Sequence, residues 1–139
     1  MQVKIQNGKL GQAINLLFNL SLKGKKSRHR TKFIKLLDER LREVAEQEQE
    51  LLKEHCHLDG KGDPKKTDDG KSWDVKDKEA FLKDKKELYE EEMVIEGGDV
   101  SGMLKTVKEI LDECEEEWQG AEATTYFELC EIFDEGVNE

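Results

Sequence analysis

The sequence is poor in residues that interrupt helices and in residues that form covalent or metal crosslinks. It has one proline and three cysteines, and aromatic residues make up 6% of the chain. A single proline leaves long helices uninterrupted. An odd number of cysteines without CxxC spacing excludes a disulfide framework and is typical of reduced thiols inside a cell.

Long hydrophobic runs are also missing. The most apolar stretch, residues 13–22, is interrupted by Asn15, Asn19 and Ser21. It is too short to cross a membrane, and no small-residue cleavage site follows it. We therefore expect a soluble, intracellular protein without a membrane partner.

Catalytic and nucleotide-binding motifs are absent from the chain. It has no GxSxG, no Cys-His signature, and only an isolated Gly97-Gly98 where a phosphate-binding loop would need more glycines and a Lys. The histidines are His29, His55 and His57. We predict that the protein is not an enzyme, has no catalytic residues and needs no cofactor.

Charge is what the sequence has in abundance, and the two signs are separated. Charged residues make up 40% of the chain, apolar residues 35%, and the net charge is −10. Residues 23–42 hold nine Lys or Arg against two acidic residues, whereas twelve acidic and no basic residues follow Lys108. This pattern favours head-to-tail self-association, pairing of the two poles within one chain, or docking to a charged partner.

Hydrophobic periodicity predicts a mainly α fold in a single domain over residues 1–139. A long antiparallel helical hairpin is expected to pack with about three further helices and a minor two-stranded β element. Ser27 and either Asp99 or Ser101 are the expected helix N-caps, and Gly136 is the expected end of the last helix. The expected elements are a strand at 2–6, helices at about 9–22, 27–57, 76–92, 101–118 and 121–134, a strand at about 93–96 that pairs with the first, and a loop at 58–75.

A heptad seam runs along the second predicted helix and is typical of a coiled coil. Two of its positions, Glu48 and His55, are polar. The seam consists of Ile34, Leu37, Leu41, Val44, Glu48, Leu51, His55 and Leu58.

After this helix, a turn at Asp69-Gly70 would form a small hairpin carrying Trp73.

The segment EHCHLDGKGDP, residues 54–64, is tested as a metal site and rejected. On a helix, His55 and His57 point about 200° apart, so they cannot share an ion. Read as a calcium loop, the segment has Lys61 at a ligand position and Pro64 where glycine is required. We predict no metal, and interpret the segment as the end of a helix followed by a chain reversal.

Two charged segments are candidate partner-binding surfaces. The first is an acidic helix face formed by Glu109, Asp112, Glu113, Glu116 and Glu117, which could also mimic nucleic acid. The second is a basic patch of Lys25, Lys26, Arg28 and Arg30, which is a weaker candidate for binding nucleic acid because the chain as a whole is acidic.

The chain resembles a family of small acidic phage and prophage proteins of unknown function, found in tailed phages of Gram-positive bacteria. The resemblance lies in MQVKIQNGKLGQAINLL, GKKSRHRTKFIKLLDERLREV, LLKEHCHLDGKGDP, EEEMVIEG and YFELCEIFDE. It covers most of the chain in outline, and it implies no catalytic residues. The His-Cys-His triplet is not a feature of the family.

The resemblance implies a phage-encoded protein that works in the host cytoplasm or in the virion. Together with the charge pattern, it favours a non-enzymatic protein that acts by protein–protein contact, as an inhibitor or modulator of a host factor, including a defence factor. A structural or assembly component of the virion, associated with the tail, is the alternative. Nucleic-acid binding through residues 23–42 is a weaker one.

Overall fold

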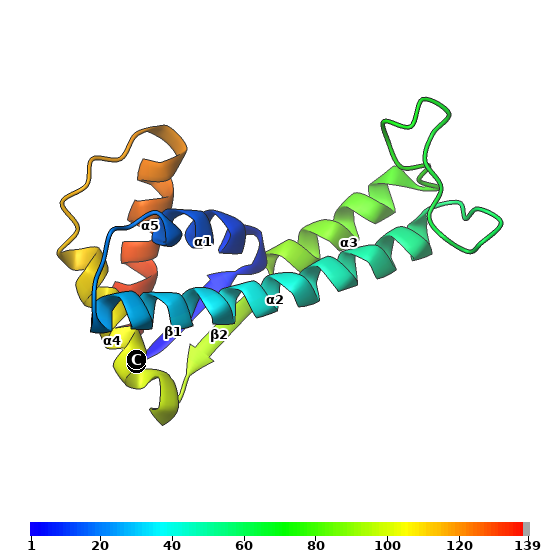
Figure 1. The fold of residues 1–139 in the computed structure, drawn as a ribbon. Helices are drawn as coiled ribbons and strands as arrows, with labels where there is room; N and C mark the ends of the chain where they lie inside the picture. The colour runs from blue at the N-terminus through cyan, green and yellow to red at the C-terminus, as the bar shows by residue number, and fades with distance from the viewer. Residues whose placement is uncertain (138–139) are drawn as a thin grey trace. The chain divides into compact units, whose positions relative to one another are not determined.

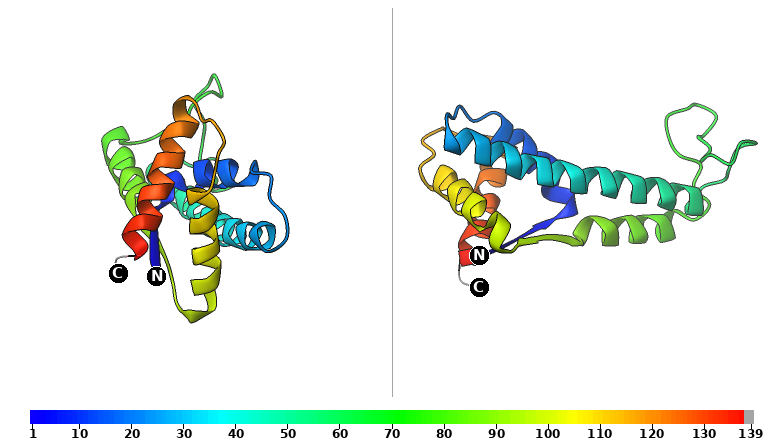
Figure 2. Two further views of the ribbon diagram at one scale, coloured as in Figure 1. Left: turned by 90° about the vertical axis from the view of Figure 1, so that its left-hand side faces the viewer. Right: turned by 60° about the horizontal axis from the view of Figure 1, so that its bottom comes forward.

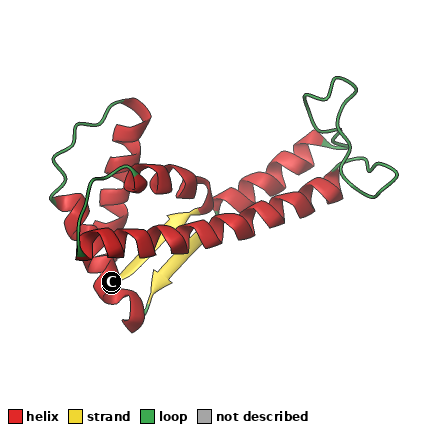
Figure 3. Ribbon diagram, viewed as in Figure 1, coloured by secondary structure: helices red, strands yellow, loops and turns green. Residues whose placement is uncertain are grey.

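The computed structural model describes residues 1–137, and its backbone divides into two compact units. Within the described residues, the first unit contains residues 1–41 and 92–137, and the second contains Arg42–Glu91. The predicted fold class is confirmed: the described residues form five α-helices and one two-stranded antiparallel sheet (Figures 1 and 3). The elements are β1 (Gln2–Gln6), α1 (Leu10–Phe18) after a 3-10 turn at Asn7–Lys9, α2 (Lys25–His55), α3 (Lys78–Glu90), β2 (Glu92–Glu96), α4 (Gly98–Asp112) and α5 (Gly120–Val137).

The predicted pairing of the two strands is confirmed. Strand β1 runs antiparallel to β2, with Val3 opposite Ile95 and Lys4 opposite Val94. Strand residues alternate between the two faces of a sheet, so Val3, Ile5 and Ile95 are buried while Lys4 and Val94 face outward. The sheet thereby contributes one apolar face to the core of the first unit.

The core of the first unit is built by helices that cover this apolar face. The buried residues include Leu10 and Leu17 of α1 and Leu104 and Val107 of α4. Helices α2 and α5 contribute further buried residues to the same core. The rings of Phe33 and Phe133, which join α2 to α5, meet edge to face with centroids 5.6 Å apart; such pairs stabilise a core beyond the area they bury.

Helix α5 ends against the backbone of β1. Figure 2 shows the last turn of α5 beside the start of β1 in both views. A Cβ atom on Gly136 would lie 2.1 Å from the Gln2 carbonyl oxygen, so only glycine permits this approach. The prediction that Gly136 ends the helix is wrong, because α5 continues to Val137 and Gly136 instead allows close packing.

The first predicted helix is shorter than expected, and its last residues, 19–22, belong to a connection. Helix α1 ends at Phe18 rather than at residue 22. Arg30 of α2 donates hydrogen bonds to the carbonyl oxygens of Leu17, at 2.7 Å, and Leu20, at 2.8 Å. A cation at the carbonyls of a helix end is favourable, and the Leu17 carbonyl also accepts from the Asn19 and Leu20 amides, so a long-range contact adds to the local ones at this boundary.

Two helix starts also differ from prediction. Helix α2 begins at Lys25, directly after Gly24 with a φ of 63°, and not at a Ser27 cap. Helix α4 begins at Gly98 after Gly97, which has a φ of 114° and takes the place of the predicted caps Asp99 and Ser101. Left-handed glycines here replace the side-chain caps, because they turn the backbone without a Cβ penalty.

The second unit pairs the end of α2 with α3. Asp77 caps α3 by accepting a hydrogen bond from the Ala80 amide at 3.2 Å. The two helices run antiparallel, since Glu48 contacts Tyr89 and His55 contacts Asp84. A small core forms where they meet the loop, and it consists of Leu52, Cys56 and Phe81, with Leu51, Trp73 and Val75 packed against it.

The predicted seam of α2 does not continue along the whole helix. Leu37 and Val44 are buried as expected, but in the second unit Leu52 is buried in place of Leu51, and Leu58 lies outside the helix with 48% of its surface exposed. Residues up to Leu41 pack in the core of the first unit and later ones pack with α3. Because the two parts of α2 pack in two different cores, the buried positions need not form one continuous stripe along the helix.

The loop between α2 and α3 is held by backbone hydrogen bonds. The His57 amide donates to the Asp74 carbonyl, and the Lys65 amide donates to the His57 carbonyl. The predicted turn at Asp69-Gly70 is present: Thr67 donates to the Ser72 carbonyl, and Gly70 has a φ of 71°. No helix within residues 1–137 combines the length and the hydropathy needed to cross a membrane.

Replacing Gly136 with Ala is expected to lower the free energy of unfolding by about 2 kcal/mol or more, because the new Cβ would displace the β1 backbone. Gly102→Ala is the matched control: this helical glycine has open space around it, and alanine should raise stability by up to about 1 kcal/mol. Urea unfolding in a Trp73→Phe background, followed by Trp118 fluorescence, measures the first unit. Equal stability of the two variants would contradict the packing argument.

Candidate functional site

The acidic segment that follows α4 is not helical. Helix α4 was predicted to reach residue 118 but ends at Asp112, and residues 113–119 form a connection without helix or strand. The three consecutive glutamates 115–117 would otherwise lie at the negative end of the helix dipole, where acidic charge is destabilising. Like charges would also crowd one turn. Charge repulsion therefore gives a physical reason for the early end of α4.

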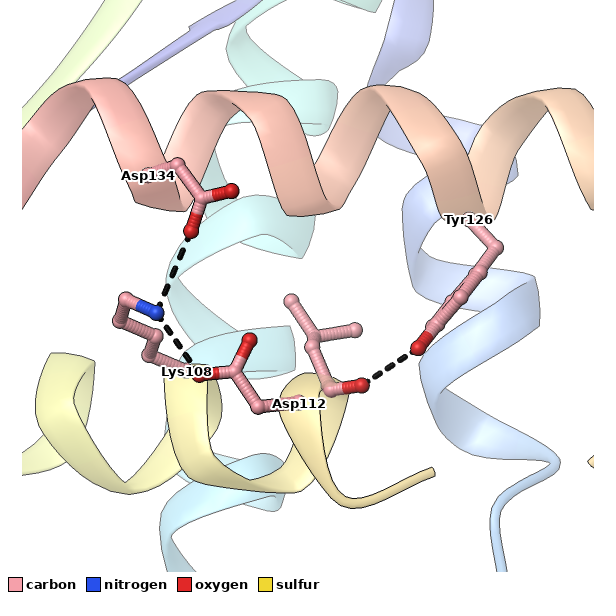
Figure 4. A network of polar contacts seen from close by, with 5 residues as sticks. Lys108, Asp112, Tyr126 and Asp134 are labelled. Atoms are coloured by element: carbon pink, nitrogen blue, oxygen red, sulfur yellow. Dashed lines mark hydrogen bonds and ion pairs between the residues drawn. The ribbon is translucent and has the colours of Figure 1, made fainter. Parts of the chain in front are cut away.

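A side chain from α5 completes the end of α4. The Tyr126 hydroxyl donates a hydrogen bond of 2.5 Å to the Leu111 carbonyl oxygen (Figure 4), which also accepts hydrogen bonds from the Glu113 and Cys114 amides at the end of the helix. The indole of Trp118 stacks on the Tyr126 ring with centroids 5.9 Å apart. Burial is the main cause that raises the pKa of Tyr126 to about 12.

A lysine on α4 joins the same two helices one turn away. The Lys108 ammonium lies 2.7 Å from a carboxylate oxygen of Asp112 and 3.2 Å from one of Asp134 (Figure 4). The hydrogen bond to Asp112, followed by that to Asp134, raises the pKa of Lys108. Asp112, which was predicted to belong to a partner-binding face, is therefore engaged within the molecule.

A groove lies beside the acidic connection. It has a volume of about 360 Å³ and combines apolar side chains with an acidic rim. We call it the acidic groove, because one lysine faces three glutamates there. Its lining consists of Leu20, Ser21, Leu22, Lys26, Ile110, Glu113, Cys114, Glu115 and Glu116.

The two charge poles of the sequence meet at one point of this groove. The Lys26 ammonium lies 2.5 Å from a Glu113 carboxylate oxygen, and this hydrogen bond is the main cause that raises the pKa of Lys26. Pairing of the poles within one chain, one of the arrangements left open by the sequence, is therefore present at this contact. Glu115 and Glu116 are exposed and form no ion pair with another residue of the described range 1–137.

The five acidic residues predicted to share one helix face do not do so. Glu109 is exposed on α4, and Asp112 and Glu113 are paired with lysines. Glu116 and Glu117 lie on the connection after the helix. Glu115 lines the groove but was not among the predicted site residues, although it begins the run of three glutamates in the sequence.

The predicted basic patch is divided between different roles. Lys26 pairs with Glu113, and Arg30 binds carbonyl oxygens at the end of α1. Lys25 and Arg28 are exposed. His29 Nδ1 lies 2.9 Å from the Thr106 hydroxyl, and burial, with the neighbouring cations second, lowers the pKa of His29.

A second groove, of about 460 Å³, lies between α2 and the start of α4 in the first unit. Its rim carries Lys32 and Lys35 but also Glu39 and Asp99. These charges cancel, so this groove does not select a partner by its sign. The acidic groove is the one with a net charge, and it is the better candidate for specific recognition.

Comparison with known proteins places the chain in a family. The model of the family described as "Protein of unknown function (DUF1617)" matches residues 1–138, and the chain therefore belongs to this family. No curated protein and no solved structure matches the chain.

Replacing Tyr126 with Phe should lower the free energy of unfolding of the first unit by about 1 kcal/mol, since the hydrogen bond between the Tyr126 hydroxyl and the Leu111 carbonyl is lost. Because the folded pKa of about 12 lies above the ordinary value of 10.0, the contribution of Tyr126 is complete below pH 10 and is lost as the pH rises towards 12.

The Tyr89→Phe variant isolates this titration, because the chain has two tyrosines. Tyrosinate absorbance should then show one midpoint near 12 in the folded protein and one near 10 in denaturant. A folded midpoint near 10 would mean that Tyr126 is not held against α4 as described.

Proposed function

We propose that this member of the DUF1617 family acts by protein–protein contact and that the acidic groove is its binding surface. The partner would present a segment that is basic and partly apolar. The proposal rests mainly on Glu115 and Glu116, exposed carboxylates without an ion pair among residues 1–137, on the rim of a groove that also contains Leu20, Leu22 and Ile110.

Unpaired carboxylates in a row are costly within the molecule and useful to a partner. Each repels its neighbours, and Lys26, the lysine at the groove, is already held by Glu113. A partner's Lys or Arg would relieve the repulsion and would be attracted from a distance. The apolar side chains of the groove would supply affinity, because burying them removes their surface from water.

The same surface supports a role as an inhibitor or modulator of a host factor. Basic segments with apolar neighbours are frequent on proteins that bind nucleic acids, and a row of carboxylates can occupy them in place of phosphates. The resemblance to phage and prophage proteins suggests a phage-encoded protein that meets such a factor in the host cytoplasm. Incorporation into the virion, with a tail-associated role, is the alternative.

A tagged copy expressed in a bacterial host should capture one dominant basic protein at about 50 mM salt and release it at about 500 mM, where charges are screened within a few ångströms. Glu115→Lys combined with Glu116→Lys should abolish the capture. Glu122→Lys combined with Glu131→Lys is the matched control: it makes the same charge change at exposed positions of α5 and should retain the partner.

Three results would count against the proposal. Capture that is equally weakened by both double variants would reflect net charge and not the groove. Stoichiometric presence of the protein in purified virions, without a host partner, would favour the assembly role. Salt-sensitive binding of duplex DNA that Arg28→Glu abolishes would favour nucleic-acid binding.

A further inference from the structure

The second unit brings three metal-ligating side chains together. Glu54 and His55 lie at the end of α2, and Asp84 lies on α3. One nitrogen or oxygen atom from each lies within 4.8 Å of the others, and within residues 1–137 this is the one such group of three. His55 Nε2 and Asp84 Oδ2 are 2.6 Å apart.

The cluster differs from a metal site at the His-Cys-His triplet, in which His55 and His57 would have to share an ion. In the structure His57 is exposed and outside the cluster, and Cys56 is buried in the small core. Burial also raises the pKa of the Cys56 thiol, which disfavours the thiolate that metals bind. The additional ligands come from a neighbouring residue and a second helix.

The imidazole of His55 is held in place before any ion binds. Its side chain is 14% exposed, and its ring packs edge to face on Phe81 with centroids 5.8 Å apart. The His55 carbonyl accepts a hydrogen bond of 2.8 Å from the Lys76 amide, which fixes the end of the helix. A ligand already in position loses little freedom on binding.

The carboxylates leave the outer side of the cluster open. Glu54 is exposed, and the Asp84 side chain is 39% exposed. An ion bound to the three side chains would therefore keep positions for water, as in zinc sites with three protein ligands. The nearby Lys85 does not oppose an ion at close range, because its ammonium pairs with Glu48 at 3.2 Å.

We propose that Glu54, His55 and Asp84 bind a divalent first-row transition metal ion, with Zn²⁺ as the probe. An imidazole nitrogen with carboxylate oxygens suits zinc and its neighbours, whereas Mg²⁺ and Ca²⁺ prefer oxygen ligands alone. The ion takes the place of the hydrogen bond between His55 and Asp84. The site lies in the second unit, and its binding would link α2 to α3 there.

The test uses the full chain after treatment with a chelator. Thermal unfolding of a Trp118→Phe variant, followed by Trp73 fluorescence, reports on the second unit. Saturating ZnCl₂ should raise the midpoint by about 2–5 °C, and MgCl₂ at the same concentration should not. His55→Ala should abolish the zinc shift, and His57→Ala, which removes an imidazole two residues away, should retain it.

Two further variants keep the test decisive if His55→Ala fails to fold. Asp84→Asn and Glu54→Gln preserve size and each should weaken Zn²⁺ binding at least about tenfold by calorimetry. The proposal is overturned if zinc gives no shift, if Mg²⁺ gives an equal one, or if the shift persists in His55→Ala and is lost in His57→Ala. In the first case His55 and Asp84 form a hydrogen bond and nothing more.

Discussion

The pairing of β1 with β2 is the contact on which the first unit depends. It joins residues 2–6 to residues 92–96, so the unit cannot form until distant parts of the chain have met. Closing so long a loop costs entropy before any contact repays it. Burial of Val3, Ile5 and Ile95 offsets this cost, because their side chains form the apolar face that the helices cover. The contact of Gly136 with Gln2 then fixes α5 on the same strand.

Composition explains why the apolar residues form two small cores and not one larger one. With 35% apolar and 40% charged residues, the chain has little apolar surface for each helix. The apolar residues of helix α2 are divided between the two cores. Phe33 and Leu37 are buried in the core of the first unit, whereas Leu52 is buried in that of the second. Ionic and hydrogen-bonded contacts then orient helices whose packing is limited, as Lys108 does between α4 and α5 and Glu48 does between α2 and α3.

The sequence was sufficient where local patterns decide the outcome. Alternation in residues 2–6 and helical periodicity elsewhere predicted the fold class and the pairing of the strands. Prediction from the sequence failed where a residue distant in the chain contributes to the end of a helix. The end of α1 depends on Arg30 and the end of α4 depends on Tyr126, and neither side chain is close in sequence to the carbonyl that it caps. The cluster of Glu54, His55 and Asp84 was missed for the same reason, because spacing along one helix cannot reveal a ligand on another.

Charge repulsion connects the local structure of the acidic segment to its availability. A helix that continued through the glutamates 115–117 would place them at its negative end, and the chain instead leaves α4 at Asp112. The connection places Glu115 and Glu116 at the rim of the groove, while Tyr126 and Lys108 join α4 to α5. The intramolecular cation at the groove, Lys26, neutralises one carboxylate of three. The segment therefore keeps a net negative charge on a fixed support, and this is the arrangement that recognition of a basic partner requires.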